Sequence, residues 1–295
     1  MRIGVIGIPG KWSTEALADA LEARTDYRRV MDMADIRLDL NTMQLMHREQ
    51  DLCELDGLAV KKITQEYCPN TLDRLELLRV AEGRGVRVFS PALNMLRLVD
   101  RLSCTVTLRN HGIPMPETVV TENIEQAVAT VQSFGSAIFK PLFSTTARGM
   151  ELLDRGIGEQ ALRSAITAFA ETNPMMYIQR RLDLAGRDLG LVFVGGGYYG
   201  AYARVSHNDA WNTTINSGGT YRAADPGAEI IELASSAQAP FELDFTTVDV
   251  AESSDGPIVF EVSAFGGFRG AREGAGLDAA GAYAELILKS LKSGP

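Results

Sequence analysis

The chain has 295 residues, of which 45% are apolar and 23% are charged, as is usual for a folded globular protein. Its net charge is −9 at pH 7 and no run of basic residues is longer than a pair, which argues against nucleic-acid binding. The three cysteines form no CxxC motif, so a reducing compartment is expected rather than a disulfide framework or a thiolate zinc site. No segment approaches the roughly 18 apolar residues of a membrane span, and the first strand pattern begins almost at Met1. We therefore expect a cytoplasmic protein without a membrane anchor, and its length predicts more than one core.

Strand and helix patterns alternate over the first part of the chain. The pattern predicts strands at 3–8, 27–33, 58–63 and 86–90, a hairpin at 36–47, and helices at 14–23 and 72–82, the first capped by Ser13. This order predicts a parallel α/β domain over residues 1–92.

The rest of the chain predicts two α+β subdomains, at 93–176 and 177–295. The first is expected to hold helices at 92–99, 102–110, 124–134 and 160–171 with strands at 118–120, 137–140 and 150–153. The second is expected to hold two hairpins, 189–205 and 245–263, because Gly195-Gly196-Gly197 and Asp255-Gly256-Pro257 are turn signals. Residues 175–182 are apolar at first and then basic, and helices at 228–239 and 278–291 complete the prediction.

The glycines after the first strand do not form a nucleotide-binding motif. Gly4, Gly7 and Gly10 are spaced GxxGxxG, and Lys11 is followed by Trp12 rather than by serine or threonine. Neither the dinucleotide fingerprint nor the phosphate loop is matched, so a tight turn between strand and helix is favoured over a phosphate site.

Two acidic residues interrupt the apolar strands of the second hairpin. Asp249 and Glu261 lie on paired strands on either side of one turn, where their carboxylates can lie side by side. Burying a lone carboxylate is costly, and two adjacent ones favour a hard cation such as Mg²⁺ bound together with phosphates. A metal site is favoured here over two acids on a solvated face.

Three basic residues are candidates for binding anions. Lys140 follows three apolar residues at a strand end, and Arg204 is the only charged residue in its strand. Arg269 follows Gly266-Gly267, where backbone N–H groups can approach an anion and the guanidinium can bind a carboxylate. Solvated strand ends and a plain loop are the alternatives. The three histidines are scattered, so zinc-dependent or triad hydrolysis is not indicated.

The ordered set Asp100-Arg101, Lys140, Ile178-Gln179, Asp188, Arg204, Asp249 and Glu261 resembles the ATP-grasp superfamily, and within it the RimK-like α-L-glutamate ligases. The resemblance covers roughly residues 90–290. The segments Trp211-Asn212-Thr213-Thr214 and 261–270 resemble the GAK-system ATP-grasp enzymes, a bacterial subgroup.

The resemblance implies an ATP-grasp fold, in which an N-terminal parallel α/β domain precedes two subdomains that clasp ATP. It implies that Lys140 and Arg101 hold phosphates, and that Arg204 faces the γ-phosphate and the acyl intermediate, with Arg269 nearby. The adenine hinge would hold Gln179, Arg180 and Leu182, the ribose would lie near Asp188, and Asn212 and Thr214 would lie on the nucleotide side. One or two Mg²⁺ ions, with Mn²⁺ as an alternative, would be held by Asp249, Glu261 and Ser263.

The function implied is an ADP-forming carboxylate–amine ligase that works through an acyl phosphate. Its partners would be ATP, an acid and an amine, with glutamate or another amino acid added to a small molecule or a peptide. A homo-oligomer is compatible with the sequence. Ser263 stands where the family usually has asparagine, Gly190 stands where it usually has arginine, and loop 143–149 is poor in glycine. These departures motivate an alternative, an ATP-binding regulator without ligase activity. The first-strand glycines suggest a second alternative, a dinucleotide-dependent oxidoreductase.

Overall fold

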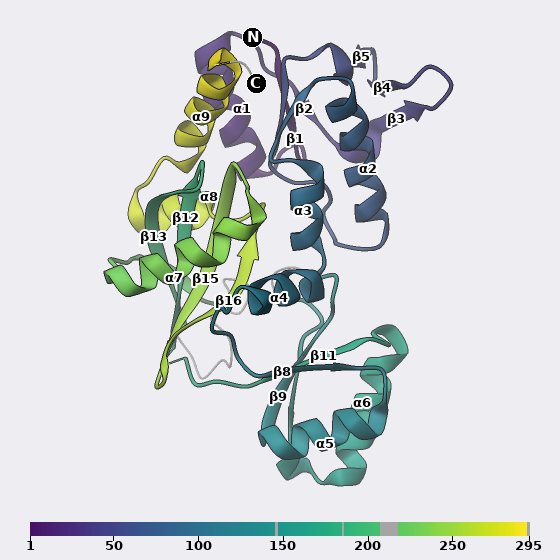
Figure 1. Cartoon of the computed structure of the whole chain (residues 1–295), viewed down its shortest axis with the longest axis vertical. Coiled ribbons are helices and arrows are strands. Elements are labelled where there is room, and N and C mark those ends of the chain that lie inside the picture. Colours follow the sequence, from purple (N-terminus) through teal and green to yellow (C-terminus); the bar gives the residue numbers. More distant parts are fainter. Residues whose placement is uncertain (145–146, 185, 207–217, 294–295) are drawn as a thin grey trace.

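The computed structural model describes residues 1–144, 147–184, 186–206 and 218–293 (Figure 1). The helices are α1 (Trp12–Thr25), α2 (Asn70–Gly83), α3 (Ala92–Val99), α4 (Arg101–Asn110), α5 (Ile124–Phe134), α6 (Glu159–Thr172), α7 (Ala228–Gln238), α8 (Phe268–Ala275) and α9 (Ala279–Ser293). The strands are β1 (Ile3–Ile6), β2 (Val30–Met31), β3 (Ile36–Asp39), β4 (Gln44–His47), β5 (Gln50–Asp51), β6 (Gly57–Val60), β7 (Arg87–Phe89), β8 (Thr118–Thr121), β9 (Ser136–Lys140), β10 (Glu151–Asp154), β11 (Met176–Arg180), β12 (Arg187–Val194), β13 (Gly197–Val205), β14 (Thr220–Ala223), β15 (Phe245–Ser253) and β16 (Gly256–Ser263).

The N-terminal region is the predicted parallel α/β domain. Its sheet has the order β2-β1-β6-β7, and each pair of neighbouring strands is parallel. Every residue of β1 and β6 is buried, as expected for strands covered on both faces. The predicted second strand is confined to β2, and α1 begins at Trp12 after Lys11 rather than after Ser13.

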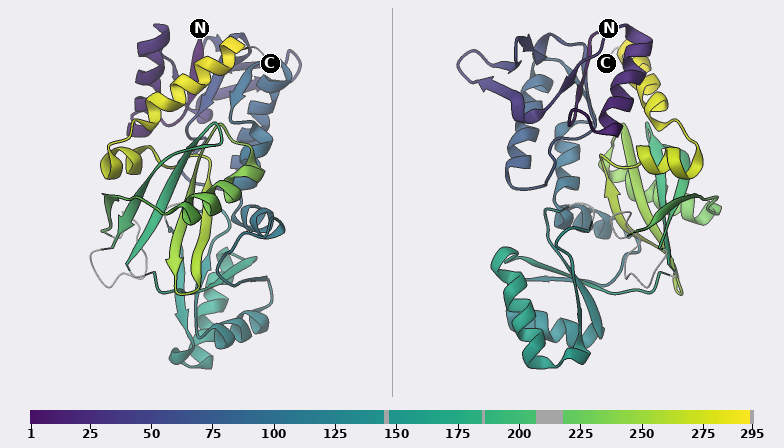
Figure 2. Two further views of the ribbon diagram at one scale, coloured as in Figure 1. Left: turned by 60° about the vertical axis from the view of Figure 1, so that its left-hand side comes forward. Right: turned by 180° about the vertical axis from the view of Figure 1, so that it is seen from behind.

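The C-terminal helix packs on this N-terminal domain as well as on the sheet that precedes it in the chain, where Tyr283 contacts Phe245. Leu17 and Leu21 of α1 share one apolar core with Tyr283 and Ile287 of α9, and the two helices lie side by side in both views of Figure 2. The Tyr283 hydroxyl also donates a hydrogen bond of 2.8 Å to the Phe89 carbonyl at the end of β7. The last helix therefore ties the C-terminal region to the first domain.

A small antiparallel sheet of order β10-β9-β11-β8 forms the far end of the molecule (Figure 1). Helices α5 and α6 cover one face, where Val131, Phe139 and Ile166 are buried in a separate core. Strand β11 pairs with both β8 and β9, so this sheet extends to Arg180. The predicted division at 176–177 falls at the first residues of this strand.

The second antiparallel sheet has the order β14-β13-β12-β15-β16 and contains both predicted hairpins. Helix α7 covers one face, because Ala234 and Ala237 share a core with Val248 of β15. Helix α8 covers the other face, where Phe268 packs with Phe245. Strand β14 lies at the edge and was not predicted from the sequence.

The segment expected to be a glycine-rich anion loop is mostly a helix. Only Gly266 and Gly267 precede α8, and Gly267 has a φ of +90°, which a residue with a side chain rarely adopts. A Cβ atom on Gly270 would lie 2.3 Å from the ring of buried Tyr202, and one on Gly274 would lie 2.8 Å from its Cβ. These glycines let the helix approach β13 closely. No helix in the described part of the chain is long and apolar enough to cross a membrane.

Candidate active site

An arginine and two carboxylates meet on three adjacent strands, β13, β12 and β15. Asp188 lies directly opposite Arg204 in the strand pairing. The Arg204 Nε lies 3.2 and 3.0 Å from the two Asp188 carboxylate oxygens, and its Nη2 lies 2.9 Å from Asp249. All three side chains are mostly buried, with exposed fractions of 18%, 8% and 24% for Arg204, Asp188 and Asp249. The Arg204 guanidinium therefore forms ion pairs with two mostly buried carboxylates.

Burial and neighbouring charges shift the pKa values in this cluster. Burial raises the pKa of Asp249 to about 6; Arg204 opposes this shift, and Asp188 and Glu261 add to it. Burial alone would lower the pKa of Arg204, but Asp249 and Asp188 together raise it. The site thus holds excess negative charge near neutral pH, and Asp249 is a carboxylate in need of a further cation.

The two predicted metal carboxylates face each other as expected from the hairpin. Asp249 and Glu261 are directly paired between β15 and β16, next to an irregularity in the register. Ser263 is paired with Thr247 two positions along, so it lies on the same face of the sheet. No group of three or more His, Cys, Asp or Glu side chains suited to a metal occurs within the described ranges. Two carboxylates still fit Mg²⁺, because this ion is usually held by one or two carboxylates and by substrate phosphates.

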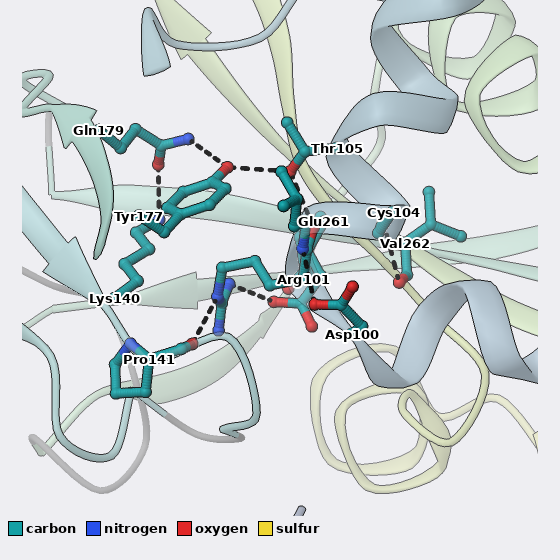
Figure 3. Close-up of polar contacts among 12 residues, drawn as sticks. Asp100, Arg101, Cys104, Thr105, Lys140, Pro141, Tyr177, Gln179, Glu261 and Val262 are labelled. Atoms are coloured by element: carbon teal, nitrogen blue, oxygen red, sulfur yellow. Dashed lines mark hydrogen bonds and ion pairs between the residues drawn. The ribbon is translucent and has the colours of Figure 1, made fainter. Parts of the chain in front are cut away.

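Arg101 brings a second guanidinium to Glu261 from the other side. Its Nη1 lies 3.6 Å from the Glu261 carboxylate, and its Nε donates to the Pro141 carbonyl at 3.2 Å (Figure 3). The Arg101 side chain is only 9% exposed, whereas that of Glu261 is 42% exposed. Arg101 therefore links the start of α4, the end of β9 and the metal strand β16.

Lys140 belongs to a buried polar chain that runs to Arg101 (Figure 3). Its Nζ donates to the Gln179 Oε1 at 2.5 Å, and the Gln179 Nε2 donates to the Tyr177 hydroxyl at 3.3 Å. That hydroxyl lies 2.9 Å from the Thr105 Oγ1, which in turn donates to the Arg101 carbonyl at 3.0 Å. Since Thr105 gives its only hydroxyl proton to that carbonyl, Tyr177 is the donor to Thr105.

The environment of Lys140 lowers the pKa of its ammonium to about 7. Burial is the main cause, and Arg101 adds to it, while Glu261 acts in the opposite direction. The ring of Phe260 also lies 5.5 Å from the ammonium. A buried ammonium of this kind gains from a nearby phosphate, because the anion restores its preference for the charged form.

The remaining predicted site residues are placed differently. Arg180 lies on the face of β11 opposite Gln179, where it pairs with Glu117 at 2.7 Å and stacks on Phe134, so only its backbone faces the Lys140 side. Leu182 is half-buried just beyond β11. Arg269 is exposed on α8 and pairs with Glu273 one helical turn away at 2.6 Å. Asn212 and Thr214 lie outside the described residues.

Sequence reasoning missed Tyr177, Thr105 and Tyr202. Tyr177 and Gln179 are two residues apart on β11 and so point to the same face, and strand periodicity could therefore have placed Tyr177 beside Lys140. Thr105, on a helix, carried no such signal, whereas the same two-residue spacing places Tyr202 on the Arg204 face of β13. Tyr202 lies two residues before Arg204, and a Cβ on Gly190 would lie 2.4 Å from its ring. The tyrosine ring thus fills the space beside Gly190, where the sequence departs from the family.

Comparison with known proteins agrees with this geometry. The model of the RimK-like ATP-grasp domain matches residues 99–287. The tetrahydromethanopterin:α-L-glutamate ligase of Methanosarcina acetivorans is 25% identical over 268 residues, which cover 86% of this chain and 83% of that protein. A probable α-L-glutamate ligase of Trichodesmium erythraeum is also 25% identical, over 100% of this chain and 98% of that protein. The solved structure of the ATP-grasp ligase PsnB with a minimal precursor, Mg and ADP has a TM-score of 0.73 at 18% identity, and 98% of each chain is covered.

The fold and the family match define an ATP-grasp protein. The chain belongs to the RimK-like ATP-grasp family, whose members are ligases that form amide bonds and release ADP. It is therefore an ATP-dependent carboxylate–amine ligase that uses Mg²⁺. This result leaves no support for the dinucleotide-dependent oxidoreductase. Consistent with that, the Gly10 N–H after β1 donates to the Glu15 carboxylate at 2.6 Å, so this N–H group is used within the turn.

Proposed function

We propose that this ligase activates a carboxylate as an acyl phosphate and couples it to an amino acid, with glutamate as the first candidate. The observation that carries the proposal is the pairing of Asp249 with Glu261 between two guanidinium groups, Arg204 on one side and Arg101 on the other. The names of the two relatives, both α-L-glutamate ligases, support glutamate as the amino acid.

The roles follow from charge and position. Lys140 and Arg101 lie on the β9 side of the site and would bind the α- and β-phosphates. Asp249 and Glu261 would hold one Mg²⁺, and Ser263 would offer a hydroxyl to a second ion. When bound, the metal supplies positive charge that offsets the charge on the transferring phosphoryl group. Arg204 would contact the γ-phosphate from strand β13.

The reaction then needs no nucleophilic side chain. A substrate carboxylate oxygen attacks the γ-phosphorus, a new P–O bond forms, and the bond to the β-phosphate breaks to release ADP. The amine next attacks the acyl carbon, the C–N bond forms, and phosphate leaves as the amine loses a proton. Arg204 and Lys140 stabilise the negative charge that moves between these groups, and positioning supplies most of the remaining rate.

The test measures ADP release by the purified protein with MgATP, a panel of amino acids and candidate acceptor acids. We expect release that depends on one amino acid and falls about 100-fold or more in Glu261→Gln, because a lost charge-stabilising group costs at least this much. Glu252→Gln is the matched control, since Glu252 lies on the same hairpin but pairs with exposed Arg187. Normal turnover in Glu261→Gln would contradict the assignment of Glu261 as a Mg²⁺ ligand. Nucleotide binding without release for any pair would favour the regulatory alternative instead.

A further inference from the structure

Three cations, Lys62, Lys11 and Arg148, gather at the carboxyl end of the parallel sheet, outside the ATP site described above. The backbone N–H groups of Lys61 and Lys62 both donate to the Ile6 carbonyl, at 2.8 and 3.2 Å, so these lysines lie directly at the end of β1. Lys11 lies at the end of the turn that leaves the same strand. In open parallel sheets, this edge is where ligands bind.

Lys61 is already used within the protein. Its side chain is fully buried, and its ammonium donates to the carbonyls of Phe265 and Gly266 and lies 4.2 Å from the Phe268 ring centre. These contacts fix the N-terminal sheet against the turn that follows the metal strand β16. They also place the neighbouring Lys62 close to the active site.

Lys62 has no such partners. It is half-buried, and within the described ranges it forms no ion pair and no side-chain hydrogen bond. Its charged neighbours are Arg148 and Lys11, and its pKa is lowered first by burial and then by these two cations. Among the described residues, Glu66 pairs with Arg148 and so compensates part of this positive charge. Three cations with one carboxylate are an unfavourable arrangement unless an anion joins them.

The segment after Lys62 leads from this group to the predicted metal ligands. The Tyr67 ring meets the Phe265 ring edge to face at 6.5 Å, two residues beyond Ser263. Tyr67 also lines a hollow together with Arg101 and Glu261. A substrate whose reacting carboxylate lies at the γ-phosphate can therefore extend along this segment towards Lys62.

We propose that Lys62, with Lys11 and Arg148, binds a second anionic group of the acid substrate, a carboxylate that does not react. The acid substrate is then at least a dicarboxylate, and a simple monocarboxylic acid is a poor substrate. This inference rests on the proposed function, because it takes the reacting carboxylate to lie at the γ-phosphate.

The test compares two probes of equal length, glutarate and pentanoate, which differ by one carboxylate. Binding to the full-length protein is measured by calorimetry, with and without the non-hydrolysable analogue AMP-PNP and Mg²⁺. We expect glutarate to bind about tenfold more tightly than pentanoate, since one charge-assisted contact is worth roughly this factor. Lys62→Met should abolish the preference. Lys289→Met is the charge-matched control, because Lys289 is exposed on α9, and it should keep the preference.

Glu66→Gln gives an independent readout if Lys62→Met folds poorly. It removes the carboxylate that pairs with Arg148 and so releases Arg148, and glutarate should therefore bind several-fold more tightly. The inference is overturned if the wild type does not distinguish the two probes, or if the preference survives in Lys62→Met. It is also overturned if Lys62→Met weakens AMP-PNP but not glutarate, because the cations would then bind nucleotide phosphates. Failure of the proposed function is seen separately, as absence of amino-acid-dependent ADP release by the wild type with MgATP.

Discussion

Removing the guanidinium between Asp188 and Asp249 should destabilise the ligand-free protein strongly. Arg204→Met keeps the length of the side chain but leaves two mostly buried carboxylates without their shared cation. Breaking a buried ion pair by removing one partner costs about 3–5 kcal/mol, whereas an exposed pair contributes about 0–1 kcal/mol. Arg187→Met is the matched control, because Arg187 is 55% exposed and pairs with Glu252, which is 45% exposed.

The assay is urea unfolding of both variants and the wild type without nucleotide, at pH 8 and at pH 5. Since the pKa of Asp249 is raised to about 6, this group is mainly protonated at pH 5 and has no charge for Arg204 to balance. The loss in Arg204→Met should therefore be smaller at pH 5 than at pH 8. The double change Asp188→Asn with Asp249→Asn should recover stability in the Arg204→Met background. A loss at pH 8 within about 1 kcal/mol of the Arg187→Met control would refute the buried cluster.

Two further predictions concern α8 and Lys140. Gly270→Ala should destabilise the protein by about 1–3 kcal/mol despite the better helix propensity of alanine, because its Cβ would meet the Tyr202 ring. Gly83→Ala is the control, because a Cβ at this helix position would have nothing within 4 Å, and it should be neutral or stabilising. If both variants change the free energy of unfolding in urea equally, the Tyr202 ring moves aside for the new Cβ and the prediction is wrong. For Lys140, whose pKa is lowered to about 7, the ammonium of the ligand-free protein is lost as pH rises above 7, whereas bound phosphate favours the charged form. The affinity for AMP-PNP should therefore fall by up to about tenfold per pH unit between pH 7 and 9, and a Lys140→Met variant that keeps this slope would contradict the assignment.

Features that depend on neighbouring residues were predictable from the sequence. The parallel first domain follows from alternating strand and helix patterns, and both hairpins follow from glycine-containing turns. The pairing of Asp249 with Glu261 follows as well, because one short turn sets which residues of the two strands face each other.

Only the tertiary structure showed how distant residues share one polar site. Lys140 of β9 reaches Thr105 of α4 through Gln179 and Tyr177 of β11, and these three elements are far apart in the sequence. Asp188 is bound to Arg204 on the neighbouring strand, and α9 returns to pack on α1. The glycines of α8 look like a loop in sequence because glycine disfavours helices, yet close contact with Tyr202 outweighs that preference. Local propensity and turn chemistry act over a few residues, whereas buried charge and side-chain packing are decided only when the chain has folded.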